Sequence, residues 1–285
     1  MDETYHIRVV GSGPIALFTC WCLSNNNNYV DIVSDRLVGH KHEYRIFLDS
    51  SYLTGVFTPN VFPFSALLEG HYDLYVVCAT PSRSLAIADE LQSSHPQSIV
   101  LILSTYSSTI FDSLVPFRST RFYAWPLVSV EAQNRSIYST NLLHLLLYQD
   151  YLDNEKFAIF NNILKPTIDL SLTSSTKVFL ARSVLTFALF SFLYDLGTHP
   201  VALNSTSLCN FCTPLVLQIS AKKNISAADF PGFSSSLSLE IQLNRLFSEL
   251  IPSFTASPAS RHNLLYLRSN RTKLKRYMSD FQDFL

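Results

Sequence analysis

Apolar residues form short continuous runs that alternate with helical segments over the first half of the chain. Strands are predicted at His6–Val10, Tyr29–Val33, Asp73–Ala79, Ser98–Leu103, Arg121–Pro126 and Leu127–Val130. Helices are predicted between them at Ile15–Leu23 and Ser84–Gln92. Continuous rather than alternating apolar runs are typical of a parallel sheet that is covered on both faces. We therefore expect an α/β fold with a Rossmann-type, doubly wound parallel sheet.

The pattern changes after Lys165 and Pro166, where helical periodicity replaces the strand rhythm. Helices separated by prolines are predicted at Ser171–Leu193, Asn204–Ile219, Leu237–Ile251 and Arg261–Leu285. At roughly 150 residues per domain, 285 residues suit two domains. We expect an NAD(P)-binding Rossmann-like domain over 1–165 and a smaller all-helical substrate and dimerisation domain over 166–285.

Composition and charge narrow the classes of protein. With 47% apolar and 15% charged residues the chain can bury a large core, and its net charge of −1 gives no support to a nucleic-acid partner. The N-terminus is acidic, and the apolar stretch Val178–Tyr194 is shorter than the roughly 20 residues of a membrane span. Five cysteines, an odd number, favour a reducing compartment. These features predict a cytoplasmic protein without a membrane partner.

The segment Gly11–Ala16 joins the first predicted strand to the first predicted helix. Gly11 permits a tight turn out of the strand, and Gly13 lets the backbone approach a pyrophosphate without an intervening Cβ. Ala16 replaces a third glycine and still permits close packing, while Pro14 suits the first helical position. The positive end of the helix favours phosphate. The residues expected to hold the pyrophosphate are Gly11, Ser12, Gly13, Pro14 and Ile15.

The end of the second predicted strand bears on the choice of cofactor. Asp35 could accept hydrogen bonds from a ribose 2′-hydroxyl, whereas Ser34 and Arg36 favour a 2′-phosphate. Neighbours at a strand end alternate in direction, so Asp35 could point away. We therefore predict NADP as the cofactor, with NAD as the alternative. Ligands of such sheets lie beyond the carboxyl ends of the strands, which adds Ala79, Thr80, Pro81, Ser104 and Thr105 to the expected cofactor site.

Three segments of the chain resemble the opine metallophore dehydrogenases of the staphylopine synthase type. The likeness lies in Val9–Ala16, where a proline follows the second glycine, in Tyr75–Thr80 and in Ile99–Ser104, and it extends over roughly residues 5 to 140. The resemblance implies a Rossmann domain, a helical domain, a homodimer and a role in metallophore biosynthesis. It also implies NAD(P)H-dependent reduction of an imine formed from an amine and a 2-keto acid.

Two departures keep other functions open. The chain is shorter than those enzymes in the substrate domain. Their catalytic histidine would fall near Arg182–Phe190, where this sequence has none. One alternative is a ketopantoate reductase-like enzyme that acts on a small 2-keto acid. The other is a catalytically inactive Rossmann-fold protein that binds a nucleotide or serves as a scaffold.

Reduction of an imine or ketone requires a proton donor within hydrogen-bond reach. His199 is one candidate, since histidine titrates near neutral pH. Lys177 is the other, because a lysine is the acid in ketopantoate reductase-like enzymes, and Arg182 could bind a substrate carboxylate in bidentate fashion. His144, in an apolar segment, is interpreted as a core residue. The pair Cys209 and Cys212 lacks a second pair at zinc spacing, so no metal is predicted.

Overall fold

The computed structural model describes two compact units, Met1–Ser174 and Ser175–Leu285. The described residues are 4–39, 43–48, 53–104, 107–117, 120–128, 130–133, 135–139, 141–149, 154–165, 167–198, 204–230, 237–256, 268 and 271–279. The division after Ser174 lies beyond the expected position at residue 165, because the strand before it pairs with the first unit's sheet.

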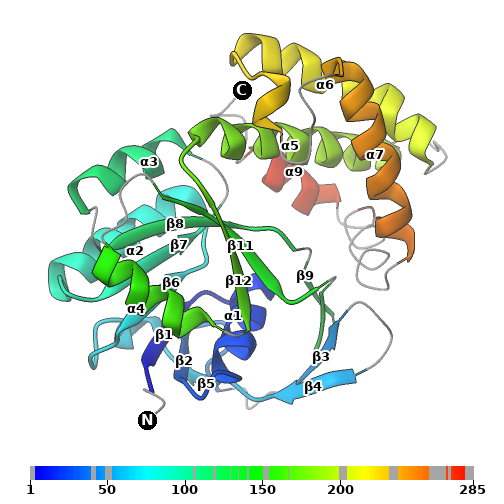
Figure 1. Ribbon diagram of the computed structural model, residues 1–285. Coiled ribbons are helices and arrows are strands. Elements are labelled where there is room, and N and C mark those ends of the chain that lie inside the picture. Colours follow the sequence, from blue (N-terminus) through cyan, green and yellow to red (C-terminus); the bar gives the residue numbers. More distant parts are fainter. Residues whose placement is uncertain are drawn as a thin grey trace. The chain divides into compact units, whose positions relative to one another are not determined.

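A large sheet forms the centre of the first unit (Figure 1). Its strands, in spatial order, are β12 (Ile168–Thr173), β11 (Leu143–Tyr148), β8 (Arg121–Pro126), β7 (Ile99–Leu103), β6 (Leu74–Val77), β1 (His6–Val10), β2 (Tyr29–Val33) and β5 (Asn60–Phe62). From β5 to β8 all neighbours are parallel, whereas β11 runs antiparallel to β8. The order β5-β2-β1-β6-β7-β8 is the doubly wound Rossmann order with β1 at its switch point. The predicted fold class is confirmed.

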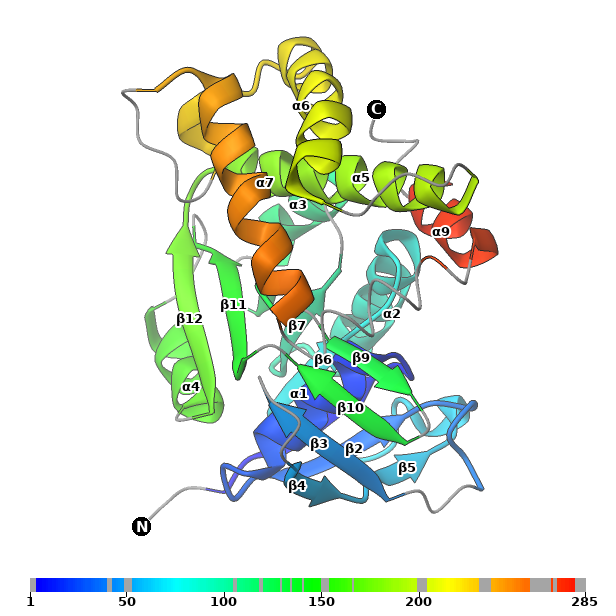
Figure 2. The ribbon, with the colours of Figure 1, turned by 90° about the vertical axis from the view of Figure 1, so that its right-hand side faces the viewer.

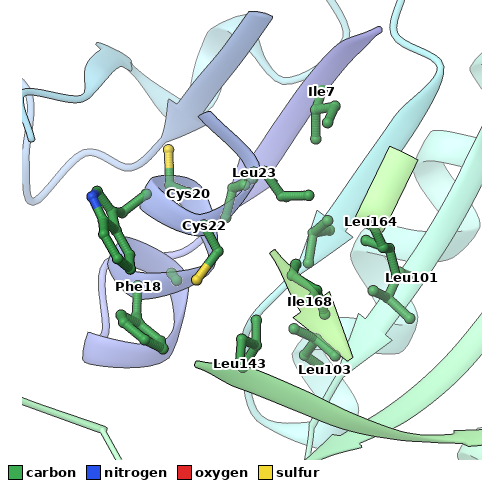
Figure 3. Close-up of a cluster of buried hydrophobic side chains, with 14 of the residues drawn as sticks. Ile7, Phe18, Cys20, Cys22, Leu23, Leu101, Leu103, Leu143, Leu164 and Ile168 are labelled. Carbon is green, nitrogen blue, oxygen red and sulfur yellow. The ribbon is translucent and has the colours of Figure 1, made fainter. Parts of the chain in front are cut away.

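Helices cover both faces of this sheet, as its continuous apolar strands require. They are α1 (Pro14–Ser24), α2 (Pro81–Ser94), α3 (Ser108–Leu114) and α4 (Asn154–Leu164), with 3₁₀ turns η1 (Phe64–Ala66) and η2 (Val115–Phe117). On one face, α1 and α4 share a buried cluster with alternate residues of β7, namely Ile99, Leu101 and Leu103 (Figure 3). On the other face, the ring of Phe111 of α3 contacts the ring of Tyr123 of β8. The residue before it in the strand, Phe122, contacts Phe160 of α4 on the first face.

A second, smaller sheet packs on α1 and was not predicted from the sequence. It consists of β4 (Leu53–Phe57), β3 (Tyr44–Leu48), β10 (Ser136–Ser139) and β9 (Val130–Gln133), in that order (Figure 2). A Cβ added at Gly55 would lie 3.2 Å from the indole nitrogen of Trp21, so strand and helix are in close contact. The expected strand at Leu127–Val130 is wrong, since β8 ends at Pro126 and Val130 begins β9.

The second unit is helical and has its own core. It consists of α5 (Thr176–Thr198), α6 (Ser205–Lys222), the 3₁₀ turn η3 (Ala227–Asp229), α7 (Leu239–Ala256) and α9 (Arg271–Ser279). Phe192, Val216 and Phe247, from three of these helices, are buried in one apolar cluster. The helix expected from Ser171 begins only at Thr176, because residues 171–173 continue β12. Of the predicted last helix, only Arg268 and Arg271–Ser279 are described.

Helix α5 has the same length as the expected helix Ser171–Leu193 but begins and ends further along the chain. It runs for 23 residues, and Thr176–Leu196 is long and apolar enough to cross a membrane by length and composition. The expectation that this stretch is too short was therefore wrong. Ala181, Val184 and Ala188 of the helix are fully buried in the core of the helical unit, and this packing accounts for its apolar character.

Candidate functional site

The loop between β1 and α1 is fixed by the backbone of neighbouring strands. The amide of Gly11 donates to the carbonyl of Val33 at 3.1 Å, and the amide of Cys78 donates to the carbonyl of Val10 at 2.9 Å. Gly11 has φ +145°, and a Cβ there would lie 2.7 Å from the carbonyl oxygen of Cys78. Side chains are excluded from this position by both conformation and space. Gly11 is therefore required by the fold itself.

Gly13 differs from Gly11 because its surroundings are open. It is the N-cap of α1 with φ −79°, a conformation that any residue adopts, and a Cβ there would meet nothing within 4 Å. Pro14 follows at the first helical position, and no described side chain caps the helix. The positive end of the helix dipole is thus exposed at Gly13, which follows the carboxyl end of β1. This arrangement suits an anion such as a pyrophosphate.

The carboxyl ends of β6 and β7 lie beside this loop in the sheet order. Thr80 is the exposed N-cap of α2, its hydroxyl makes no capping bond, and Pro81 begins the helix. The hydroxyl of Ser104 donates to the carbonyl of Ala79 at 2.9 Å. Ser104 therefore joins the two strand ends, and its hydroxyl proton is already committed. Thr105, also expected at this site, lies outside the described residues.

The end of β2 is organised by Asp35. Its carboxylate accepts the amide proton of Phe64 at 2.7 Å, so this aspartate anchors the 3₁₀ turn η1. Ser34 is buried, and its amide donates to the carbonyl of Phe62 at 2.9 Å. Arg36 is exposed. The sequence alone left open which way Asp35 points, and the structure assigns one of its oxygens to the backbone.

A buried ionic cluster below this region was missed by the sequence reasoning. Arg8 of β1 and Asp31 of β2 are register partners, with a guanidinium nitrogen 3.7 Å from the carboxylate. Tyr72 donates to Asp31 at 2.7 Å and accepts a hydrogen bond from Arg8. Arg8 also donates to the carbonyls of Ala66 and Glu69. The cluster therefore fixes the segment that follows η1. The sequence did contain a signal for this cluster, because Arg8 and Asp31 are charged residues at the centres of two predicted buried strands.

Two of the three residues predicted for the chemistry, Lys177 and Arg182, lie in helix α5. Lys177 is exposed, and its ammonium donates to the carbonyl of Asn224 at 3.0 Å. Burial lowers the pKa of Arg182 to about 10, and no hydrogen bond or ion pair joins its guanidinium to another described residue. His199 lies outside the described residues. The structure therefore describes the surroundings of Lys177 and Arg182 but not those of His199.

The remaining titratable residues singled out in the sequence have ordinary structural surroundings. The imidazole Nε2 of His144 lies 2.7 Å from the hydroxyl of Ser171, across the β11–β12 pair. Burial raises the pKa of the Cys212 thiol to about 12, and its thiol contacts the carbonyl of Ala188. In the part of the chain that the structure describes, no group of three or more His, Cys, Asp or Glu side chains could hold a metal ion.

The strand order and the glycine loop define a Rossmann-type domain of the kind found in dinucleotide-dependent dehydrogenases. No family model and no curated protein matches the sequence. By structure, the chain is similar to 2-dehydropantoate 2-reductase from Geobacter metallireducens GS-15, with TM-score 0.62 and 14% identity over 98% of this chain and 100% of that chain. A dimeric ketopantoate reductase from Staphylococcus aureus gives TM-score 0.60 and 11% identity, over 98% and 99% of the two chains.

A D-mandelate dehydrogenase, in a ternary structure with NADH and anilino(oxo)acetate, has the same fold. It gives TM-score 0.55 and 10% identity over 95% of this chain and 99% of that one. The chain therefore has the Rossmann-plus-helical fold of the ketopantoate reductases. The more specific likeness to staphylopine synthase-type enzymes is not confirmed.

Proposed function

We propose that the protein is an NAD(P)H-dependent reductase of a small 2-keto acid. The observation that carries the proposal is the open N-terminus of α1 above Gly13, at the switch point of a Rossmann sheet. The full-length match to 2-dehydropantoate 2-reductases supports this reaction over imine reduction, because no shortened substrate domain needs to be assumed. When bound, NAD(P)H would supply the hydride.

The cofactor would be held by residues around the glycine loop. Gly11, Ser12, Gly13, Pro14 and Ile15 would hold the pyrophosphate, and Ser34 with Arg36 would face the ribose 2′-position. Ala79, Thr80, Pro81, Ser104 and Thr105 would line the cofactor at the ends of β6 and β7. NADP is the proposed form, with NAD as the alternative.

Replacing Gly13 with aspartate tests the pyrophosphate site. Aspartate is a good N-cap residue, so the Gly13→Asp variant is expected to unfold at the same urea concentration as the parent, or a higher one. Its carboxylate would occupy the space where the phosphates bind, so NADPH and NADH binding should both be lost. Fluorescence titration measures binding, and the matched control is Asn204→Asp, which adds the same charge at the N-cap of α6. Wild-type NADPH affinity in Gly13→Asp would refute the site.

Arg182 would bind the substrate carboxylate. A partly buried guanidinium that has no anionic partner among the described residues carries a desolvation penalty, which a carboxylate ligand would offset. Its pKa of about 10 keeps it protonated at neutral pH. His199 and Lys177 are the proposed proton donors, and Lys177 would have to release the Asn224 carbonyl to act.

Replacing Arg182 with glutamine is expected to raise KM for the keto acid about tenfold to a hundredfold, the equivalent of one lost charge-assisted hydrogen-bonded pair. The affinity for NADPH should stay at the parent value, because the cofactor loop is untouched. Steady-state kinetics and cofactor titration measure the two effects. Lys222→Gln, which removes an exposed cation from α6, is the control. An unchanged KM in Arg182→Gln would exclude this role.

The first experiment is titration with NADPH and NADH, followed by NADPH oxidation with 2-dehydropantoate and with phenylglyoxylate. Oxidation by a keto acid alone supports the proposal. Oxidation that requires an added amine supports the opine dehydrogenase reaction. Tight cofactor binding without turnover of any substrate indicates a nucleotide-binding protein, and no binding of either cofactor refutes the proposal. The homodimer stays a prediction, and light scattering of the purified protein measures it.

A further inference from the structure

A hydrogen bond and a cation–ring contact link Asp35, Phe64 and Arg83 near the glycine loop, and Arg36 is the next residue after Asp35 in the sequence. Arg36 follows Asp35, the Asp35 carboxylate accepts the amide proton of Phe64, and the guanidinium of Arg83 lies over the Phe64 ring, 5.4 Å from its centroid. Arg83 is in the first turn of α2, immediately beyond the carboxyl end of β6. These contacts connect Arg83, beyond the end of β6, to Asp35, the residue before Arg36 at the end of β2, and β2 and β6 lie on either side of β1.

The charges of this cluster are not balanced within the described structure. No ion pair joins Arg36 or Arg83 to a described carboxylate, and both side chains are exposed. Asp35 is the acidic member of the set, and one of its oxygens is engaged by the backbone of Phe64. Two guanidinium groups and one carboxylate leave an excess of one positive charge. The N-terminus of α2, which starts with Pro81, adds to the positive potential.

We propose that Arg83, together with Arg36, binds the 2′-phosphate of NADPH and so sets the preference for NADPH over NADH. The inference rests on the proposed function and adds to it a residue from α2. Arg83 suits this task because its packing on Phe64 holds the guanidinium plane in place before the ligand arrives. Arginine binds phosphate oxygens in bidentate fashion, so a pre-positioned guanidinium contributes specificity as well as charge.

The anchoring of Phe64 by Asp35 gives that aspartate a positioning role in the proposal. By holding the η1 turn, Asp35 would set the ring on which Arg83 rests. An aspartate at the end of the second strand is usually expected to bind the 2′-hydroxyl of NADH. In this chain the Asp35 carboxylate is partly committed to a backbone amide, which removes part of that basis for NADH preference.

The test compares Arg83→Gln with the parent and with Arg45→Gln, which removes an exposed arginine from β3 of the small sheet. Dissociation constants for NADPH and NADH are measured by fluorescence titration, and adenosine 2′,5′-bisphosphate and 5′-AMP serve as competing probes. Arg83→Gln is expected to weaken NADPH and the 2′,5′-bisphosphate about tenfold or more, the scale of one charge-assisted phosphate contact. NADH and 5′-AMP should bind as in the parent. Arg83→Lys should recover part of the lost NADPH affinity, because lysine keeps the charge but lacks the planar guanidinium that binds two phosphate oxygens.

The outcomes separate this inference from the function on which it rests. Equal weakening of NADPH and NADH by Arg83→Gln would overturn it, since the arginine would then act on the shared part of the cofactor or on the fold. Unchanged binding of both would overturn it as well, while leaving the reductase proposal intact. If the parent protein binds neither cofactor, both proposals are wrong. The selective loss should also shrink as salt is raised, because exposed charges are screened.

Discussion

Gly11→Ala is expected to destabilise the protein by about 2 to 4 kcal/mol, the combined effect of backbone strain and steric overlap. The residue has φ +145°, and the new methyl group would lie 2.7 Å from the carbonyl oxygen of Cys78. The obstacle is backbone of the adjacent strand end, so it cannot rotate away as a flexible side chain could. Urea unfolding measures the loss, and cofactor affinity should fall as well because the loop must shift.

Gly39→Ala is the matched control for this result. Gly39 also has a positive φ, +79°, but a Cβ there would meet nothing within 4 Å. Its loss should be about 1 to 2 kcal/mol, the strain of the left-handed conformation alone. The difference between the two variants reports the overlap with Cys78 together with the greater backbone strain of φ +145° over +79°. Equal losses would mean that β1 and β6 can separate at this point, and the rigid account of the loop would be wrong.

The βαβ unit could be predicted because its signals are local. The glycines of Gly11–Ala16 stand between a short strand, apolar except for His6 and Arg8, and a helix that is almost entirely apolar. The strands β6 and β7 were recognised for the same reason, with ends within two residues of those predicted. Where each residue's neighbours in sequence decide its conformation, pattern and structure agree.

The small sheet could not be predicted because its pairing is not local. β3 pairs in parallel with β10, so Arg45 faces Ser136 across about ninety residues of intervening sequence. Its strands are short, and Gly55 in β4 weakens the local strand signal. The strand β12 was missed for a different reason. Ile168–Thr173 alternates apolar with polar residues, as a strand does, but its last three residues were assigned to the predicted helix that begins at Ser171.

The cofactor loop was predicted from the sequence, but its division of roles was not. Gly11 and Gly13 look equivalent in the motif, yet one is required by the backbone of Cys78 and the other faces open space. Arg83 was absent from the prediction because its contact with Phe64 joins two segments whose proximity depends on the strand order. Site residues contributed by separate loops need the topology before they can be seen.

Asp31→Asn is expected to destabilise the protein by about 3 to 5 kcal/mol, because it leaves Arg8 as a buried charge without its counter-ion. Both side chains are only 2% exposed. The Arg121–Asp89 pair provides the comparison. Its nitrogen–oxygen distance is shorter, 2.8 Å against 3.7 Å, but Asp89 is 63% exposed. Asp89→Asn should therefore cost less, about 1 to 2 kcal/mol, because Arg121 is buried but Asp89 is solvated, and asparagine keeps an acceptor oxygen for the guanidinium.

We therefore expect burial, rather than the nitrogen–oxygen distance, to decide which pair contributes more to stability. A double-mutant cycle tests whether the loss in Asp31→Asn comes from the unpaired charge of Arg8. Arg8→Met with Asp31→Leu removes both charges, so the pair should cost clearly less than the sum of the single variants. Some loss will remain, because the carbonyls of Ala66 and Glu69 lose a donor. Urea unfolding of the four proteins gives the coupling. Additive losses would show that Arg8 stabilises the fold through those carbonyls alone and that its charge is not balanced by Asp31.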